Sequence, residues 1–176
     1  YDWTWRLTFH IERLLSKRPD CIVANAKAGR VYATDQGFSS TAMTVIQNGI
    51  DTNIYVRNEE SGRSIREEFG LDVAAPVIGI VARLDPIKDH HTFLQAAAKL
   101  SASNRSVRFL CVGSGTAVFE NSLKRLAASL GLNNKVIWAG QRHDLPAIYS
   151  ALDILSLTST SEGFPNTLAE GMACSV

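Results

Sequence analysis

The sequence predicts an α/β protein built on a Rossmann-like parallel sheet with helices on both faces. Three observations predict this class. Short runs rich in β-branched residues alternate with stretches in which apolar residues recur at helical spacing. The runs are continuously apolar, as expected of parallel strands that are buried on both faces. A loop rich in glycine, polar or charged residues follows each run, and loops in this position carry the ligand sites of open α/β sheets.

The first part of the chain is expected to form helix, strand, helix and strand in turn. Strands are expected over residues 20–24 and 43–46, and a short helix over residues 26–35. The dipeptide Asn48-Gly49 then predicts a turn. The first helix is expected over residues 5–18, where apolar side chains recur at Leu7, Ile11, Leu14 and Leu15.

The second part begins with a helix expected over residues 61–69, with Gly70 as its C-terminal cap. Four strand–helix units follow. The strands are expected over residues 77–82, 107–112, 135–139 and 153–158. The helices are expected over residues 90–102, 117–130, 145–152 and 167–174. The second of these helices is the clearest, because one apolar face closed by Gly131 is formed by Leu123, Leu126, Ala127 and Leu130.

Composition excludes several classes of protein. The 176 residues are 45% hydrophobic and 20% charged, which is ordinary for a globular protein. A net charge of +1 with scattered basic residues gives no footprint for nucleic acid, so we expect no nucleic-acid partner. No apolar run approaches the roughly 18 residues of a membrane span. No signal peptide is visible at the start.

The cysteines and histidines predict neither a disulfide framework nor a metal site. Cys21, Cys111 and Cys174 are odd in number and widely spaced, so we expect small buried side chains in a reducing, cytoplasmic location. His90 and His91 are adjacent and would point about 100° apart on a helix, which disfavours chelation. We expect both to be surface or helix-cap residues.

Four loops are expected to meet at one edge of the sheet. Residues 83–88, 113–115, 140–144 and 158–166 each follow one of the four expected strands. Because parallel strands end at the same edge, their packing would assemble one site from these distant segments.

The segment from Glu162 to Ala173 combines two carboxylates with a glycine, a proline and a helix start, which suits a sugar attached to a diphosphate. Backbone at Gly163 can approach a ligand closely, and the helix start after Pro165 would point N–H groups at an anion. Glu162 would lie beside the sugar. Glu170, in the first helical turn, would accept hydrogen bonds from a ribose. A structural alternative is a capping box in which Glu170 bonds back to the helix start.

Charge compensation for a diphosphate is expected from side chains. The sequence contains no Asp-x-Asp pair for a metal, so we expect no metal and no cofactor. Arg83 and Lys88 are the candidate cations, and preorganised donors of this kind stabilise a leaving group. Alternatives remain open: the two cations can be an exposed basic pair, and Gly113-Ser114-Gly115 an ordinary strand-to-helix turn. Asp144 is expected to cap the next helix, with backbone near Gln141 and Arg142 bordering the base.

These segments together resemble a known family. The run Glu162 to Ala173 is similar to the E-x7-E signature of retaining, nucleotide-sugar-dependent glycosyltransferases of family 4. Further matches follow the order that this family has, and they cover nearly the whole chain: Gln47 to Thr52, Val81 to His90, and Val112 to Gly115.

The resemblance implies a partial GT-B fold, which in full has two facing Rossmann-like domains. Residues 1–47 would be the end of the acceptor-side domain, and residues 48–176 a truncated donor-binding domain. The chain alone would then be inactive. The parent protein would transfer a sugar with retention to a glycan, a lipid-linked sugar or a small molecule, as a peripheral protein if the acceptor lies in a membrane.

The resemblance also implies roles for individual residues. Arg83 and Lys88 would contact the diphosphate, Glu162 the donor sugar and Glu170 the ribose. Retention in this family is attributed to same-face attack assisted by the departing phosphate, so Glu162 is not assigned as a covalent nucleophile. The remaining donor-binding candidates are Gly163, Phe164, Pro165, Asn166, Thr167, Leu168, Gly113, Gly115, Gln141 and Arg142.

Two residues of the sequence depart from the pattern of this family. Gly171 stands where the family usually has alanine, and Ser175 stands where it usually has a helix-closing glycine. The serine requires either a left-handed backbone conformation or a different helix end.

Two other functions remain open. A sugar-nucleotide epimerase of the same fold is one alternative, although the sequence offers no identifiable acid and base around the sugar. A non-catalytic nucleotide-binding module is the other.

Overall fold

The computed structural model describes residues 3–176. The chain divides into two compact units, the first ending at Gly49 and the second beginning at Ile50. Residues 46–50, all within the described part, form no turn, and the backbone at Gly49 does not have a positive φ. The turn expected at Asn48-Gly49 is therefore wrong, and the segment that joins the two units has no regular structure.

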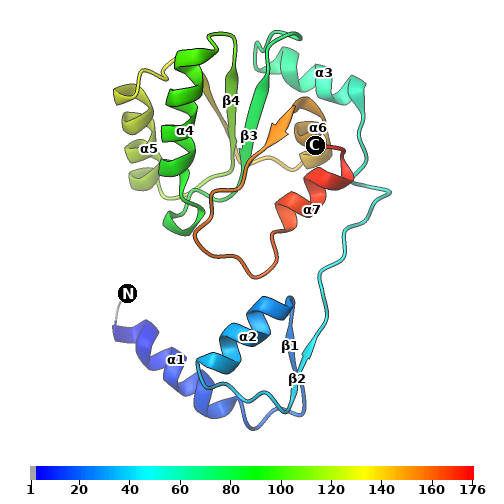
Figure 1. The fold of residues 1–176 in the computed structure, drawn as a ribbon, viewed down its shortest axis with the longest axis vertical. Coiled ribbons are helices and arrows are strands. Elements are labelled where there is room, and N and C mark those ends of the chain that lie inside the picture. The colour runs from blue at the N-terminus through cyan, green and yellow to red at the C-terminus, as the bar shows by residue number, and fades with distance from the viewer. Residues whose placement is uncertain (1–2) are drawn as a thin grey trace. The chain divides into compact units, whose positions relative to one another are not determined.

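The first unit contains helix α1 (Trp3–Leu15), strand β1 (Ile22–Ala24), helix α2 (Lys27–Asp35) and strand β2 (Met43–Val45). The two strands pair in parallel (Figure 1). The order of elements is as expected, with boundaries within about three residues. The apolar stripe of α1 is exposed, since its side chains Leu7, Ile11, Leu14 and Leu15 retain between 44% and 71% of their accessible surface.

The second unit is built on a four-stranded sheet in the order β5-β4-β3-β6, with every neighbouring pair parallel. Its strands are β3 (Val77–Val81), β4 (Arg108–Val112), β5 (Val136–Gly140) and β6 (Ile154–Leu155). The strand expected over residues 153–158 is too long. The chain leaves the sheet after Leu155, where the Ser156 amide and hydroxyl both donate to the Gly79 carbonyl, each at 2.8 Å.

Helices cover both faces of this sheet (Figure 1). One core packs α4 (His90–Ser103) and α5 (Ala117–Ser129) against the strands through Phe93, Leu94 and Leu123. The other packs α3 (Glu59–Glu68), α6 (Leu145–Ala151) and the end of α7 (Asn166–Ala173) through side chains that include Ile65, Ile148 and Cys174. The expected α/β class, with a parallel sheet between helical layers, is confirmed.

Helix ends follow local chemistry. Gly70 and Gly131 have the positive φ of C-terminal caps, as expected. Ser175 also has a positive φ of 61°. Its amide donates to the Met172 carbonyl and the Val176 amide donates to the Gly171 carbonyl, each at 3.0 Å, which is the Schellman pattern. Helix α7 therefore ends as a glycine-capped helix does, with a serine in the left-handed position.

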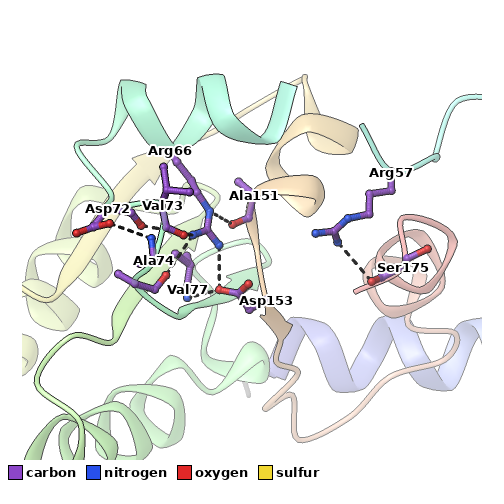
Figure 2. Close-up of polar contacts among 10 residues, drawn as sticks. Arg57, Arg66, Asp72, Val73, Ala74, Val77, Ala151, Asp153 and Ser175 are labelled. Atoms are coloured by element: carbon purple, nitrogen blue, oxygen red, sulfur yellow. Dashed lines mark hydrogen bonds and ion pairs between the residues drawn. The ribbon is translucent and has the colours of Figure 1, made fainter. Parts of the chain in front are cut away.

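Arg66 forms hydrogen bonds to several segments at the edge of the sheet where strands β3 and β6 begin (Figure 2). Its Nε donates to the Ala151 carbonyl and its Nη2 to Asp153, each at 2.9 Å. The same Asp153 oxygen accepts from the Val77 amide at 2.7 Å. The Arg66 side chain is 11% exposed. Its Nη1 donates to three further carbonyls, those of Asp72, Val73 and Ala75.

Buried cysteine and histidine side chains only partly match expectation. Cys111 and Cys174 are buried as expected, but Cys21 is exposed. His91 is exposed, whereas His90 is completely buried at the first position of α4, behind the capping residue Asp89. Burial lowers the pKa of His90 to about 4, and neither ring nitrogen has a hydrogen-bond partner among the described residues. His90 is therefore an uncharged core residue at neutral pH.

Candidate functional site

The loops that leave the strands lie side by side because the ladder of hydrogen bonds continues into them. Beyond the last strand residues, the Ala82 amide donates to Val112 at 2.9 Å and the Gly113 amide donates to Gly140 at 2.8 Å. A pocket of about 330 Å³ lies at this edge. Its lining comes from four separate segments and consists of Val81, Ala82, Arg83, Val112, Gly113, Ser114, Gln141, Arg142, Leu145 and Thr167.

This pocket collects part of the site expected from the sequence. Among the candidate residues, all of them described, five line it: Arg83, Gly113, Gln141, Arg142 and Thr167. The remaining candidates lie outside its lining, namely Lys88, Glu162, Glu170, Gly115, Gly163, Phe164, Pro165, Asn166 and Leu168. The expected site is therefore only partly assembled in this pocket.

Gly113 and Gly115 are required by backbone packing. Gly113 has a φ of +137°, and a Cβ there would overlap the Ala82 carbonyl oxygen. A Cβ at Gly115 would overlap the carbonyl of Leu84, whose amide donates to Ser114 at 2.9 Å. The loop after β4 thus lies against the loop after β3 at a distance that only glycine allows. This contact accounts for both glycines as a structural turn and also forms one wall of the pocket.

Lys88 and Glu162 form a direct pair. Lys88 Nζ donates to Glu162 Oε1 at 2.7 Å, and each side chain is only 22% exposed. Burial by itself would raise the pKa of Glu162. The hydrogen bond from Lys88, together with the Lys88 charge, outweighs that effect and holds this pKa below its ordinary value. The carboxylate expected beside the sugar is therefore ionised and bonded to the cation expected beside the diphosphate.

The segments that carry this pair are fastened to each other through their backbones. Lys88 ends the 3-10 turn Pro86–Lys88, which Asp85 caps by accepting from the Ile87 amide. The Thr158 hydroxyl lies 3.0 Å from the Lys88 carbonyl and 2.9 Å from the Asp89 carbonyl. The Thr160 amide donates to the Ile87 carbonyl at 2.9 Å. The loops after β3 and β6, 74 residues apart in sequence at the ion pair, thus form one structure.

The two arginines of the pocket differ in availability. The Arg83 side chain is 78% exposed and its nearest carboxylate, on Asp85, is 4.0 Å away. Arg142 is bound on all sides: it pairs with Glu68 at 2.5 Å and Asp144 at 2.6 Å, and lies over the Phe69 ring. Hydrogen bonds to Asp144 and then Glu68 raise the pKa of Arg142. Arg83, whose contact with Asp85 is long and exposed, is therefore the more available of the two for a ligand.

Asp144 precedes α6 as expected, but the capping role expected for its side chain is wrong. Within the described residues, that side chain makes no capping hydrogen bond to the helix. It bonds Arg142 instead, and this bond lowers the pKa of Asp144 despite partial burial. The pairing fixes the loop after β5, where the Ser114 hydroxyl lies 3.4 Å from Gln141 Oε1.

Glu170 lies in the second turn of α7, because this helix begins at Asn166 after Pro165. Its expected place in the first turn is therefore wrong. The capping-box alternative is wrong too, since Thr167 lies inside α7 and the residue before the helix is Pro165, which makes no side-chain capping hydrogen bond. Glu170 Oε2 accepts a hydrogen bond from the Tyr149 hydroxyl at 2.7 Å. Sequence reasoning missed Tyr149. A tyrosine in a mostly apolar helix was the available signal, because a buried phenol needs a polar partner.

Neither a metal-ligand cluster nor a membrane-spanning helix is found in the described part of the chain. Within residues 3–176, no group of three or more His, Cys, Asp or Glu side chains is arranged to hold a metal ion. None of the described helices is long and apolar enough to cross a membrane.

Comparison with known proteins decides the family. Residues 62–176, well over half of the chain, match the family described as "Glycosyl transferases group 1". The chain belongs to the group 1 glycosyl transferases. A curated relative, the D-inositol 3-phosphate glycosyltransferase of Segniliparus rotundus, is 30% identical over 172 residues, which is 93% of this chain and 37% of that protein. The corresponding Mycobacterium tuberculosis (strain F11) protein is 29% identical over 165 residues, 93% of this chain and 34% of its own length.

Solved structures agree with this membership. Anabaena Alr3699/HepE, determined in complex with UDP-glucose, superposes with a TM-score of 0.88 at 27% identity, covering 96% of this chain and 47% of that one. Sucrose-phosphate synthase from Thermosynechococcus elongatus superposes with a TM-score of 0.84 at 20% identity, which supports the fold alone. The observed fold is thus that of GT-B glycosyltransferases, and the group 1 chain described here spans less than half the length of the proteins it matches.

Proposed function

We propose that this chain is the donor-binding part of a retaining, metal-independent glycosyltransferase of family 4, with residues 1–47 belonging to the acceptor side and residues 48–176 binding the nucleotide-sugar. The observation that carries the proposal is the fastening of the loop with Arg83 and Lys88 to the loop with Glu162. It gathers two cations and a carboxylate beside a pocket at the ligand edge of a parallel sheet.

A diphosphate leaving group needs positive charge where its own negative charge develops. Arg83 is exposed at the pocket and suits bidentate contact with phosphate oxygens. Lys88, fixed by its backbone and bonded to Glu162, supplies a second charge. Glu162 then lies where the sugar joins the diphosphate, held as a carboxylate by Lys88. We assign Glu162 to sugar contact and leave the substitution at the anomeric carbon to same-face attack by the acceptor.

The nucleotide is proposed to occupy the pocket, with its base beside Gln141 and the backbone of Arg142 and its phosphates toward Gly113, Gly115 and the start of α7. Glu170 accepts from the ribose. Uracil is the first base to test, because a structural relative was solved with UDP-glucose. The acceptor classes that fit are a glycan, a lipid-linked sugar and a small molecule such as the inositol phosphate in the name of the Segniliparus relative. We place the protein in the cytoplasm, at a membrane surface if its acceptor is a lipid.

Donor hydrolysis tests this proposal without knowledge of the acceptor. The full-length protein that contains this chain is incubated with UDP-glucose and EDTA, and water serves as acceptor. We expect UDP and glucose to appear together, with the nascent sugar in the α configuration of the donor when it is observed by NMR before mutarotation.

Each other outcome contradicts a stated part of the proposal. Nascent β-glucose excludes retention, and activity that EDTA abolishes excludes metal independence. A new sugar-nucleotide in place of free sugar indicates the epimerase. Binding of UDP-glucose, GDP- or ADP-glucose with none of them consumed indicates a non-catalytic module.

A further inference from the structure

A buried tyrosine holds one of the two signature carboxylates. The Tyr149 hydroxyl donates to Glu170 Oε2 at 2.7 Å. The Tyr149 side chain is completely buried, and its ring lies 6.2 Å from the ring of Tyr55, so that packing fixes the direction of the phenol. A bond from a fixed donor to a charged acceptor is among the stronger hydrogen bonds in proteins. The buried Tyr149 hydroxyl therefore fixes the orientation of the Glu170 carboxylate.

The pair lies next to the proposed nucleotide pocket on both helices. Leu145 lines the pocket, and Tyr149 follows it by four residues in α6. Thr167 lines the pocket, and Glu170 follows it by three residues in α7. Residues three or four apart share a helical face, so each member of the pair lies one turn beyond a pocket-lining residue.

The carboxylate retains capacity for a ligand. An ionised carboxylate has about four acceptor positions on its two oxygens, and the Tyr149 hydroxyl uses one of them. Glu170 is partly exposed whereas Tyr149 is not. Because the Tyr149 hydroxyl already orders the Glu170 side chain, its exposed side can accept a hydrogen bond from a ligand hydroxyl group without a further loss of side-chain entropy.

We infer that Tyr149 is a positioning residue that orients Glu170 toward a ribose hydroxyl, and that this pair makes the site select ribonucleotides over 2′-deoxyribonucleotides. The inference rests on the proposed function, since it takes Glu170 as the ribose acceptor. It adds to that function the Tyr149 hydroxyl, which orients Glu170 for the contact, and the resulting selectivity for ribonucleotides.

The test compares UDP with 2′-deoxy-UDP as ligands of the 176-residue chain by calorimetric titration. Wild type is expected to bind UDP about tenfold or more tightly than 2′-deoxy-UDP, since an unmatched hydrogen bond to a charged group costs about that factor or more. Tyr149→Phe removes only the hydroxyl. We expect it to weaken UDP about tenfold while leaving 2′-deoxy-UDP unchanged, so that the selectivity disappears. The control Tyr32→Phe, an exposed position in the first unit, should alter neither ligand.

A double-mutant cycle adds a readout that a purely structural tyrosine would not move. If Tyr149 acts through Glu170, then Tyr149→Phe should have no effect on UDP affinity once Glu170→Gln is present. Additive losses overturn the inference, as does a Tyr149→Phe variant that keeps the selectivity or weakens both ligands equally. A wild-type chain that binds both ligands alike overturns the inference alone. A folded wild-type chain that binds neither overturns the proposed function and this inference with it.

Discussion

Replacing Lys88 by alanine is expected to lower the turnover of sugar transfer by about two orders of magnitude, equivalent to about 3 kcal/mol of transition-state stabilisation. Two effects combine. In the proposed site, the variant loses a fixed cation beside the departing diphosphate. It also leaves Glu162 as an unpaired carboxylate in a site where only 22% of its side chain is exposed, and this negative charge would face the leaving group.

Steady-state kinetics of the full-length protein measure this effect. We expect kcat to fall more than the donor KM rises, because the charge on the leaving group grows toward the transition state. Lys124 provides a matched control. It pairs with Glu120 at 2.6 Å on the surface of α5, so Lys124→Ala removes an equally short ion pair and should leave kinetics unchanged. Normal donor kinetics in a folded Lys88→Ala variant would contradict the assignment.

Replacing Arg66 by alanine is expected to destabilise the second unit by about 2–4 kcal/mol. The guanidinium joins the end of α6, the loop before β3 and Asp153 (Figure 2). Its removal leaves the Ala151 and Ala75 carbonyls without this donor in a part-buried setting. Asp153 contributes less, because 48% of its side chain is exposed and water can replace the arginine.

Urea unfolding followed by circular dichroism gives the change in free energy of unfolding. Arg63 supplies the control, since it is exposed on the same helix three residues earlier. Arg63→Ala should change stability by less than about 0.5 kcal/mol. Similar losses in both variants would show that charge on α3, rather than the bonds of Arg66, stabilises this edge of the sheet.

Most of the second unit could be predicted from the sequence because its strands are continuously apolar and glycines mark the ends of two of its helices. The expected starts of β3 and β4 are at or within one residue of those observed, and Gly70 and Gly131 close helices as expected. β6 was overestimated because its polar continuation resembles a strand. The Ser156 hydroxyl bonds the Gly79 carbonyl within β3, and the Thr158 hydroxyl bonds the Lys88 carbonyl in the loop after β3. No local pattern distinguishes these side-chain contacts from the continuation of a strand.

The site could be predicted at the level of loops but not of side-chain pairs. Sequence position placed Arg83, Gly113 and Gln141 after parallel strands, and these three do line one pocket. The Lys88–Glu162 and Tyr149–Glu170 pairs join segments 74 and 21 residues apart. Which atoms meet across such distances depends on how the loops pack, and the intervening sequence does not encode it locally. Arg142 illustrates the same limit, since its partner Glu68 comes from α3.

We propose that this chain binds the diphosphate of a nucleotide-sugar through its own side chains, without a metal ion. Thermal unfolding of the 176-residue chain during titration with UDP, GDP and ADP, each repeated with EDTA, tests it most directly. A nucleotide at 100 times its dissociation constant should add about 2.7 kcal/mol of stability, and we predict that one nucleotide, with UDP the first expectation, does so equally in EDTA. A folded chain that no nucleotide stabilises, or a stabilisation that EDTA abolishes, would contradict the claim.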